Sequence, residues 1–168
     1  MWESIRDDVI ADLRKYVHTT RLIITGISLG GGLACLSFID IKASGEFDNL
    51  EVITFGAPRV GNKKWAKFFD SEATATRIYI RRDPINFLPR CITPFCNYSP
   101  VGQPVVCYPG KSECDYKNKK EEDGLEESLS YLMEEVKEHK EEIAEGEYGG
   151  IIDHIFGYKK IKDYTLVQ

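Results

Sequence analysis

The sequence predicts an α/β fold, in which helices flank a mostly parallel β-sheet. One observation supports this fold class, and another supports a single domain. Short β-branched apolar runs at residues 21–26, 50–55 and 76–80 alternate with segments of helical apolar spacing at 30–43 and 63–70. The chain of 168 residues shows no internal repeat and no break in composition, so we expect one domain across residues 1–168.

The first half of the chain contains most of the predicted elements. A helix is predicted over residues 3–17, where apolar side chains recur at spacings of three and four. The strand at 21–26 is apolar, so we expect both of its faces to be buried. The helix at 30–43 is expected to end at Ser44-Gly45. Three aromatic residues of the helix at 63–70 are predicted to face inward: Trp65, Phe68 and Phe69.

The second half of the chain predicts longer irregular segments. Residues 85–103 are rich in proline and cysteine and are expected to form a loop, followed by a short strand at 105–108. Residues 109–124 are polar and are predicted to be a mobile loop. An amphipathic helix is predicted over 125–144, with an acidic face that we interpret as solvated, and a last helix around 151–161.

The pattern Gly26-x-Ser28-x-Gly30 lies between an apolar strand and a helix. It is typical of a nucleophile elbow, in which a serine occupies a sharp strand-to-helix turn. We expect both glycines to be required, because a tight turn brings the flanking backbones close together. The alternative is an ordinary serine at a helix start, but the strand before it and the small residues after it favour a nucleophile. The Leu29 amide would then donate to a developing oxyanion.

A serine nucleophile needs a base, and the chain has three histidines. His18 precedes the elbow strand, which would place it roughly 25–30 Å from Ser28. His139 lies in the predicted acidic helix and is most simply a solvated neighbour of glutamates. His154 remains the candidate base, because it comes last in the chain and follows a Gly-Gly loop that could reach the carboxyl edge of the sheet.

Asp83 is the candidate acid that orients His154. It stands just past the strand at 76–80, at the edge of the sheet where Ser28 is expected to emerge. Its other interpretation is an aspartate that initiates a turn before a proline. Asp153 is adjacent to His154, and neighbouring side chains on a helix do not face each other, so we interpret Asp153 as a helix-start residue.

The five cysteines fall into two groups. Cys35 follows the elbow on an apolar helix and is expected to be a buried small hydrophobe. The other four cluster in a loop-rich segment, at Cys91, Cys96, Cys107 and Cys114. Disulfides, with Cys91–Cys96 and Cys107–Cys114 as the most local pairing, free thiols and a zinc site all stay open, although neither pair has the C-x₂-C spacing of a strong zinc motif. Disulfides would indicate an oxidising compartment and a secreted or lumenal protein.

The composition excludes several classes of protein. A net charge of −5 with 42% hydrophobic and 29% charged residues is ordinary for a globular domain. Mild acidity argues against a nucleic-acid partner, and no basic run suggests a membrane-binding patch. Residues 1–8 lack the apolar segment of a signal peptide, and no apolar run is long enough to span a bilayer.

Several segments resemble the class 3 lipases, the fungal-type triacylglycerol lipases. The most specific is ITFGAPRVGN at 53–62. The others are the elbow at 25–31, RDPI at 82–85 with the Leu88-Pro89 pair, YSPVG at 98–102 and DHIFGY at 153–158. The resemblance implies an α/β-hydrolase fold with Ser28, Asp83 and His154 as its catalytic triad. It also implies an acylglycerol or other ester substrate, contact with a lipid interface, and no metal or other cofactor.

The chain departs from this family in two respects. Ile27 stands where the family usually has a histidine, and only 27 residues precede Ser28. The family has a further N-terminal portion with its first strands, a lid and a loop that gives a second oxyanion donor. We therefore expect the C-terminal part of the fold, with the elbow strand at an open sheet edge that an N-terminal segment or an oligomer partner completes.

Two functions follow from these observations. The first is a serine hydrolase that cleaves carboxylic esters, in particular acylglycerols. The alternative is a catalytically inactive lipase-like domain that acts as a binding or assembly module, which the missing oxyanion donor favours.

Overall fold

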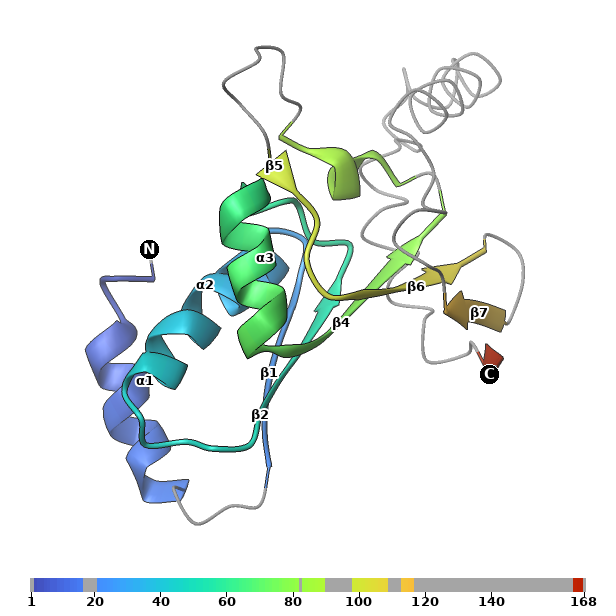
Figure 1. Ribbon diagram of the computed structural model, residues 1–168. Helices are drawn as coiled ribbons and strands as arrows, with labels where there is room; N and C mark the ends of the chain where they lie inside the picture. The colour runs from blue at the N-terminus through green and yellow to red at the C-terminus, as the bar shows by residue number, and fades with distance from the viewer. Residues whose placement is uncertain are drawn as a thin grey trace, which may run out of the picture.

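A computed structural model describes residues 2–16, 21–81, 83–89, 98–108, 113–116 and 165–167 (Figure 1). Within these residues, the main sheet consists of β1 (Leu22–Ile27), β2 (Leu50–Phe55), β4 (Thr74–Ile80), β6 (Gln103–Cys107), β7 (Glu113–Tyr116) and β8 (Thr165–Val167), adjacent in that order. β1, β2, β4 and β6 pair in parallel, whereas β7 is antiparallel to β6. The predicted mostly parallel sheet is confirmed.

The first helix and a 3₁₀ turn precede β1 in the chain, and the other helical elements lie between strands. The helical elements are α1 (Arg6–Leu13) with the 3₁₀ turn η1 (Arg14–Tyr16), α2 (Leu29–Ala43), α3 (Lys63–Glu72) and the 3₁₀ turn η2 (Pro84–Phe87). α2 ends as predicted, since Gly45 has the positive φ of 68° that lets a glycine terminate a helix. α3 begins at an N-cap, where the Asn62 side chain accepts a hydrogen bond of 2.9 Å from the Trp65 amide.

The range 85–103, predicted to be a loop, contains regular structure in its described residues. A two-stranded antiparallel sheet joins β3 (Gly61–Asn62) to β5 (Tyr98–Ser99), and β6 begins at Gln103. The helices predicted at 125–144 and 151–161 lie outside the described residues.

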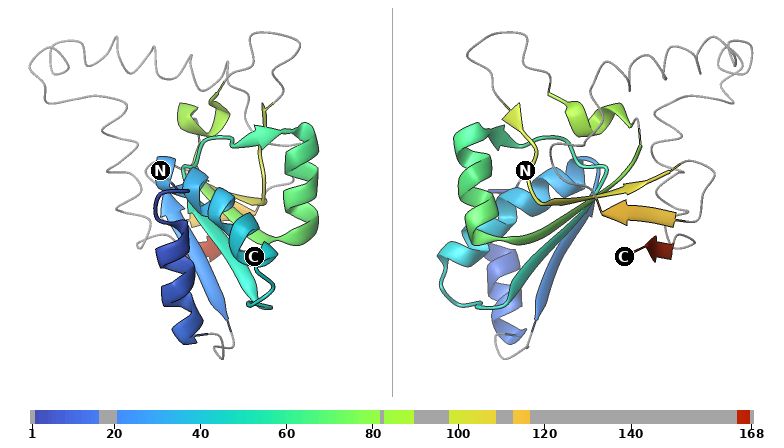
Figure 2. Two further views of the ribbon diagram at one scale, coloured as in Figure 1. Left: turned by 90° about the vertical axis from the view of Figure 1, so that its left-hand side faces the viewer. Right: turned by 45° about the vertical axis from the view of Figure 1, so that its right-hand side comes forward.

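α1, α2 and α3 cover one face of the sheet (Figure 2). The chain steps from β1 through α2 to β2, and then through α3 to β4, each time to the adjacent parallel strand. Two right-handed crossovers that move in the same direction across a sheet place both helices on the same side.

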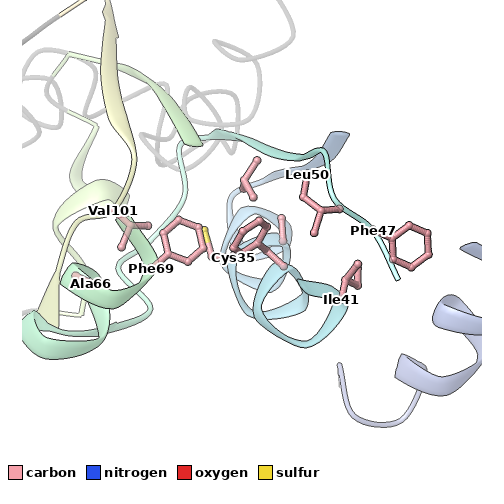
Figure 3. Close-up of a cluster of buried hydrophobic side chains, with 10 residues drawn as sticks. Cys35, Ile41, Phe47, Leu50, Ala66, Phe69 and Val101 are labelled. Atoms are coloured by element: carbon pink, nitrogen blue, oxygen red, sulfur yellow. The ribbon is translucent and has the colours of Figure 1, made fainter. Parts of the chain in front are cut away.

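The core fills the space between these helices and that face of the sheet (Figure 3). Phe38 of α2 and Phe69 of α3 are fully buried and meet edge to face, with ring centroids 5.3 Å apart. Trp65 stacks on Phe69 at the same distance. The other buried members are Ala34, Cys35, Ile41, Phe47, Leu50, Val52, Ala66 and Val101. Cys35 is a buried small hydrophobe as predicted, with an exposed fraction of 2%.

The prediction that β1 is buried on both faces is wrong. Leu22 and Ile24 pack against the core, but Ile23 is 43% exposed and Ile27 44% exposed. An apolar run shows that a strand can be buried, whereas the number of layers packed on the sheet decides whether both faces are. Along β1, the helices α1 to α3 cover only the face that carries Leu22 and Ile24.

The inward face of α3 also differs from the prediction at one residue. Phe69 is fully buried and Trp65 packs against the core, but Phe68 is 51% exposed. Consecutive residues on a helix are about 100° apart, so a buried face centred on Trp65 and Phe69 leaves Phe68 at its margin.

A disulfide between Cys107 and Cys114 joins β6 to β7, where the two cysteines are paired in register. This confirms one half of the most local pairing. Cys91 and Cys96 lie outside the described residues, so their pairing stays a prediction. The prediction of a mobile loop at 109–124 is wrong at residues 113–116, where β7 is held by its hydrogen bonds to β6.

β1 is an edge strand, as predicted. In the described part of the chain it pairs only with β2, from Leu22↔Leu50 to Ile27↔Phe55. The open side of β1 therefore carries a row of main-chain N–H and C=O groups without a strand partner among these residues.

Candidate active site

Ser28 occupies the turn between β1 and α2. It has φ 52° and ψ −126°, a left-handed backbone conformation that non-glycine residues rarely adopt. Such a residue costs on the order of 1–3 kcal/mol and persists only where its surroundings hold it in place. Here the Ser28 amide donates to the Phe55 carbonyl at 2.8 Å, and the Ser28 carbonyl accepts from the Gly31 amide at 2.9 Å. This is the geometry of the predicted nucleophile elbow.

The glycines around Ser28 do not contribute equally. A Cβ atom on Gly26 would collide with the Gly30 carbonyl, so the prediction that Gly26 is required is confirmed. A Cβ atom on Gly30 would meet nothing within 4 Å, so the prediction of a steric need there is wrong. The second crowded glycine is Gly31, where an added Cβ would lie 2.6 Å from the Cβ of Ala57. The elbow pattern alone does not predict this contact, because Ala57 belongs to the loop after β2.

Leu29 is the first residue of α2, and the amides of a first helical turn have no intrahelical acceptor. Its side chain is 63% exposed. The role of the Leu29 amide as a donor to an oxyanion at Ser28 stays a prediction, to which its place at the positive end of α2 is suited.

Asp83 lies just past the end of β4 and is 7% exposed. Its amide donates to the Ile80 carbonyl at 3.1 Å, and its Oδ1 accepts from the Ile85 amide at 2.9 Å. The interpretation of Asp83 as a turn-initiating residue is thus correct, since it caps η2. This cap does not exclude the predicted role of Asp83 in orienting His154, because a carboxylate has two oxygens and several acceptor positions.

Ser28 and Asp83 share one edge of the sheet. β1 and β4 both run parallel to β2, which lies between them, so their carboxyl ends point the same way and η2 lies beyond that end (Figure 1). His18, His139, His154 and Asp153 all lie outside the described residues, so the roles of His154 and Asp153 stay predictions.

Arg59 ties the Asp83 turn to the loop after β2. The Arg59 amide donates to the Leu88 carbonyl at 2.7 Å, and its guanidinium lies 5.7 Å from the centre of the Phe87 ring. The same guanidinium donates to the Tyr98 carbonyl at 3.3 Å. Sequence reasoning placed Arg59 in a family-like segment but gave it no role, because its contacts come from residues that are distant in the chain.

The described residues contain no group of three or more potential metal ligands, and no described helix is long and apolar enough to cross a membrane.

Burial raises the pKa of the Cys35 thiol to about 12, so the described free cysteine is protonated at neutral pH and is not a candidate nucleophile.

Comparison with known proteins identifies the family of this fold. The model of the family Lipase (class 3) matches residues 1–93, more than half of the chain, a range that contains Ser28 and Asp83 and ends before His154.

Two curated relatives are similar over the same part of the chain. The chain is 29% identical to a secreted mono- and diacylglycerol lipase A of Penicillium cyclopium over 102 residues, 59% of this chain and 33% of that protein. It is 34% identical to phospholipase A1-II 1 of Oryza sativa subsp. indica over 117 residues, 66% of this chain and 29% of that protein. The chain thus matches about a third of the length of these relatives.

Solved structures show the same fold. The Penicillium cyclopium lipase, as its N225Q mutant, superposes with a TM-score of 0.56 and 28% identity, over 62% of this chain and 38% of that one. A triacylglycerol lipase whose catalytic centre is described as a serine protease triad gives a TM-score of 0.57 and 26% identity, over 62% and 41% of the two chains. The chain therefore has an α/β-hydrolase fold, of which it shares a part with these structures.

Proposed function

Since the chain belongs to the class 3 lipase family, we propose that it is a serine hydrolase of carboxylic esters and that acylglycerols are its substrates. The observation that carries the proposal is the left-handed backbone of Ser28 at the end of β1, beside the first amide of α2. The names of the curated relatives support the substrate class, because they describe enzymes that act on mono- and diacylglycerols and on phospholipids.

The proposed reaction proceeds through an acyl-enzyme. Ser28 Oγ attacks the ester carbonyl while His154 takes its proton, and the Leu29 amide donates to the resulting oxyanion. His154 then returns the proton to the leaving alcohol. Water next attacks the acyl-enzyme while His154 takes its proton, and His154 returns that proton to Ser28 Oγ as the bond from Oγ to the acyl group breaks and the acid leaves. Asp83 holds the imidazole in the required tautomer and stabilises its charged form.

Two exposed apolar side chains support contact with a lipid interface. Leu29, beside the nucleophile, is 63% exposed, and Leu88, at the end of the Asp83 turn, is 41% exposed. Exposed large apolar side chains at one edge of a sheet favour an apolar ligand or surface there.

The first experiment tests the nucleophile. The chain is treated with a fluorophosphonate probe and the adduct is mapped by mass spectrometry, with Ser28→Ala and Ser37→Ala as matched variants. Ser37 lies on the same helix, and its hydroxyl donates to the Ala34 carbonyl. We expect an adduct at Ser28 in the parent and in Ser37→Ala and none in Ser28→Ala. An adduct at another serine contradicts the proposal.

The second experiment tests the acid and the substrate. Hydrolysis of a monoacylglycerol, a phospholipid and a water-soluble ester is compared for the parent, Asp83→Asn and Asp153→Asn. We expect Asp83→Asn to lose up to roughly 10⁴ in kcat, by analogy with serine proteases, and Asp153→Asn to lose little. The opposite order in two folded variants shows that the acid is assigned wrongly.

The second candidate function is a lipase-like binding or assembly module without catalysis. The open edge of β1 is the observation that favours it, because an unpaired edge is able to receive a further strand. A folded parent that neither reacts with the probe nor hydrolyses any of the three substrates, but binds acylglycerol vesicles, supports this alternative.

A further inference from the structure

The turn that carries Asp83 contains a second buried polar residue. Asn86, on η2, is 2% exposed, and Phe87 beside it is 5% exposed. Asn86 Nδ2 donates to the main-chain carbonyl of Asp83 at 3.1 Å. The carboxamide thus bonds the very residue that is proposed to orient His154.

Within the described residues, the oxygen of the same carboxamide, Asn86 Oδ1, is buried and has no hydrogen bond. Turning the amide over would place Oδ1 against the Asp83 carbonyl, acceptor against acceptor, so the bond from Nδ2 decides the orientation. A buried amide oxygen without a partner is unfavourable, and an apolar side chain of similar size would avoid that cost. The contact that asparagine gains in return is the bond to Asp83.

Three hydrogen bonds together fix the main chain around the Asp83 carboxylate. The Asp83 amide is bonded to Ile80, one carboxylate oxygen accepts from the Ile85 amide, and the Asp83 carbonyl accepts from Asn86. The first bond joins main-chain atoms and the second ends on the Asp83 carboxylate itself, whereas the donor of the third is the side chain of Asn86. The third is therefore the bond that a substitution can remove while the rest of the turn stays in place.

We propose that Asn86 is a positioning residue for Asp83, because its bond to the Asp83 carbonyl fixes the turn from which the carboxylate projects. The inference rests on the proposed function. A carboxylate that is held in place stabilises the imidazolium form of the base, so the bond from Asn86 to Asp83 raises the pH at which the base loses its proton. A residue that served packing alone would not affect that pH.

The chain itself suggests a variant that restores the bond. Three serine hydroxyls donate to the carbonyl three residues earlier, the spacing that separates Asn86 from Asp83: Ser37 to Ala34 at 3.0 Å, Ser44 to Ile41 at 2.7 Å and Ser71 to Phe68 at 2.7 Å. Asn86→Ser and Asn86→Ala differ in one hydroxyl and leave nearly the same space. The pair therefore separates the hydrogen bond from the loss of volume.

The test compares parent, Asn86→Ala, Asn86→Ser and Ser37→Ala in ester hydrolysis across pH and in thermal unfolding. We expect Asn86→Ala to lose about tenfold in kcat with KM nearly unchanged, and the acid-side midpoint of its kcat/KM profile to move to lower pH. Asn86→Ser should recover most of both effects. Ser37→Ala removes a similar local bond within α2 and should leave the rate and the midpoint unchanged.

Three results overturn the inference. The first is that Asn86→Ala lowers the unfolding temperature but keeps the parent's kcat and midpoint. The second is that Asn86→Ser behaves as Asn86→Ala does, or that neither folds, because the residue then serves stability. The third is a parent that does not react with a fluorophosphonate at Ser28, in which case the proposed function fails as well. A reactive parent with unaffected Asn86 variants overturns the role of Asn86 alone.

Discussion

At the scale of single residues, the elbow depends on close contacts that only some of its glycines make. The pattern Gly26-x-Ser28-x-Gly30 predicted a serine on a sharp turn, and the structure shows that this turn has a left-handed backbone at Ser28. The pattern did not distinguish a glycine with no room for a side chain, such as Gly26, from one with space around it, such as Gly30. That difference arises from the approach of helix to strand, which a local pattern does not contain.

The two glycines give a matched pair of substitutions. We expect Gly26→Ala to lower the free energy of unfolding by at least about 2 kcal/mol, because its Cβ would overlap the Gly30 carbonyl. Gly30→Ala should raise it by about 0.5–1 kcal/mol, because alanine favours a helix where space allows. Urea denaturation of both variants measures the difference. Equal destabilisation of the two would contradict the assignment of the crowded glycine.

Cys35 predicts a pH dependence. Burial raises the pKa of its thiol from 9.0 to about 12, so above pH 9 the thiol of the unfolded chain ionises while that of the folded chain stays protonated. The raised pKa therefore costs nothing below pH 9, and the free energy of unfolding falls as the pH rises beyond it. Below pH 9 we expect no alkylation of Cys35 by iodoacetamide until urea unfolds the chain. Modification of the native protein at neutral pH, seen by mass spectrometry, would disprove the burial.

At the scale of elements, the pattern of apolar residues located the strands better than it described their surroundings. β2 was predicted at 50–55 and is found there, because an apolar run bounded by turns specifies a strand locally. β1 was also located, but its exposed face depends on which layers cover the sheet. β7 escaped prediction because Glu113–Tyr116 is short and lacks an apolar run, so its pairing with β6 is what makes it a strand.

The two neighbouring phenylalanines of α3 test its orientation. Phe69 is fully buried between Phe38 and Trp65, so we expect Phe69→Ala to cost about 3–5 kcal/mol of unfolding free energy. Phe68→Ala should change it by less than about 0.5 kcal/mol, because half of that side chain is exposed. Thermal or urea unfolding of the two variants decides. A reversed order would mean that α3 is rotated from the orientation described.

The cysteine pairings give a second prediction at this scale. Proteolysis without reduction should yield a linked peptide pair that contains Cys107 and Cys114, which join β6 to β7. We also expect a link between Cys91 and Cys96, as the most local remaining pairing, and a free thiol at Cys35. Mass spectrometry of reduced and unreduced digests identifies the links. Four alkylated cysteines in the unreduced, denatured chain, beside Cys35, would exclude both disulfides.

At the scale of the whole molecule, the sheet has an open edge at β1 in the described part of the chain. An apolar edge strand with an exposed face promotes association between copies. We expect Ile23→Lys to reduce the concentration-dependent association of the chain in analytical ultracentrifugation, because Ile23 is 43% exposed on that strand. Leu36→Lys, at a similarly exposed residue of α2, is the control and should have less effect. Equal effects would show that general surface polarity, and not the edge, controls association.

The strand order also predicted more of the site than any single motif. Parallel strands end at the same edge, so Ser28 after β1 and Asp83 after β4 were expected to share it, and the pairing of both strands with β2 confirms this. The roles of Arg59 and Asn86 were not predictable, because each depends on a contact made by its side chain in the folded turn.

The position of β2 between β1 and β4 limits how the site can change in evolution. β2 separates β1, which leads to Ser28, from β4, which leads to Asp83, by two steps of about 4.8 Å each, a spacing that main-chain hydrogen bonds determine. The interval between these two strand ends is therefore independent of the side chains that β2 carries. Descendants of this chain can exchange those side chains over many generations and still keep the interval, provided that no residue is inserted into the strand.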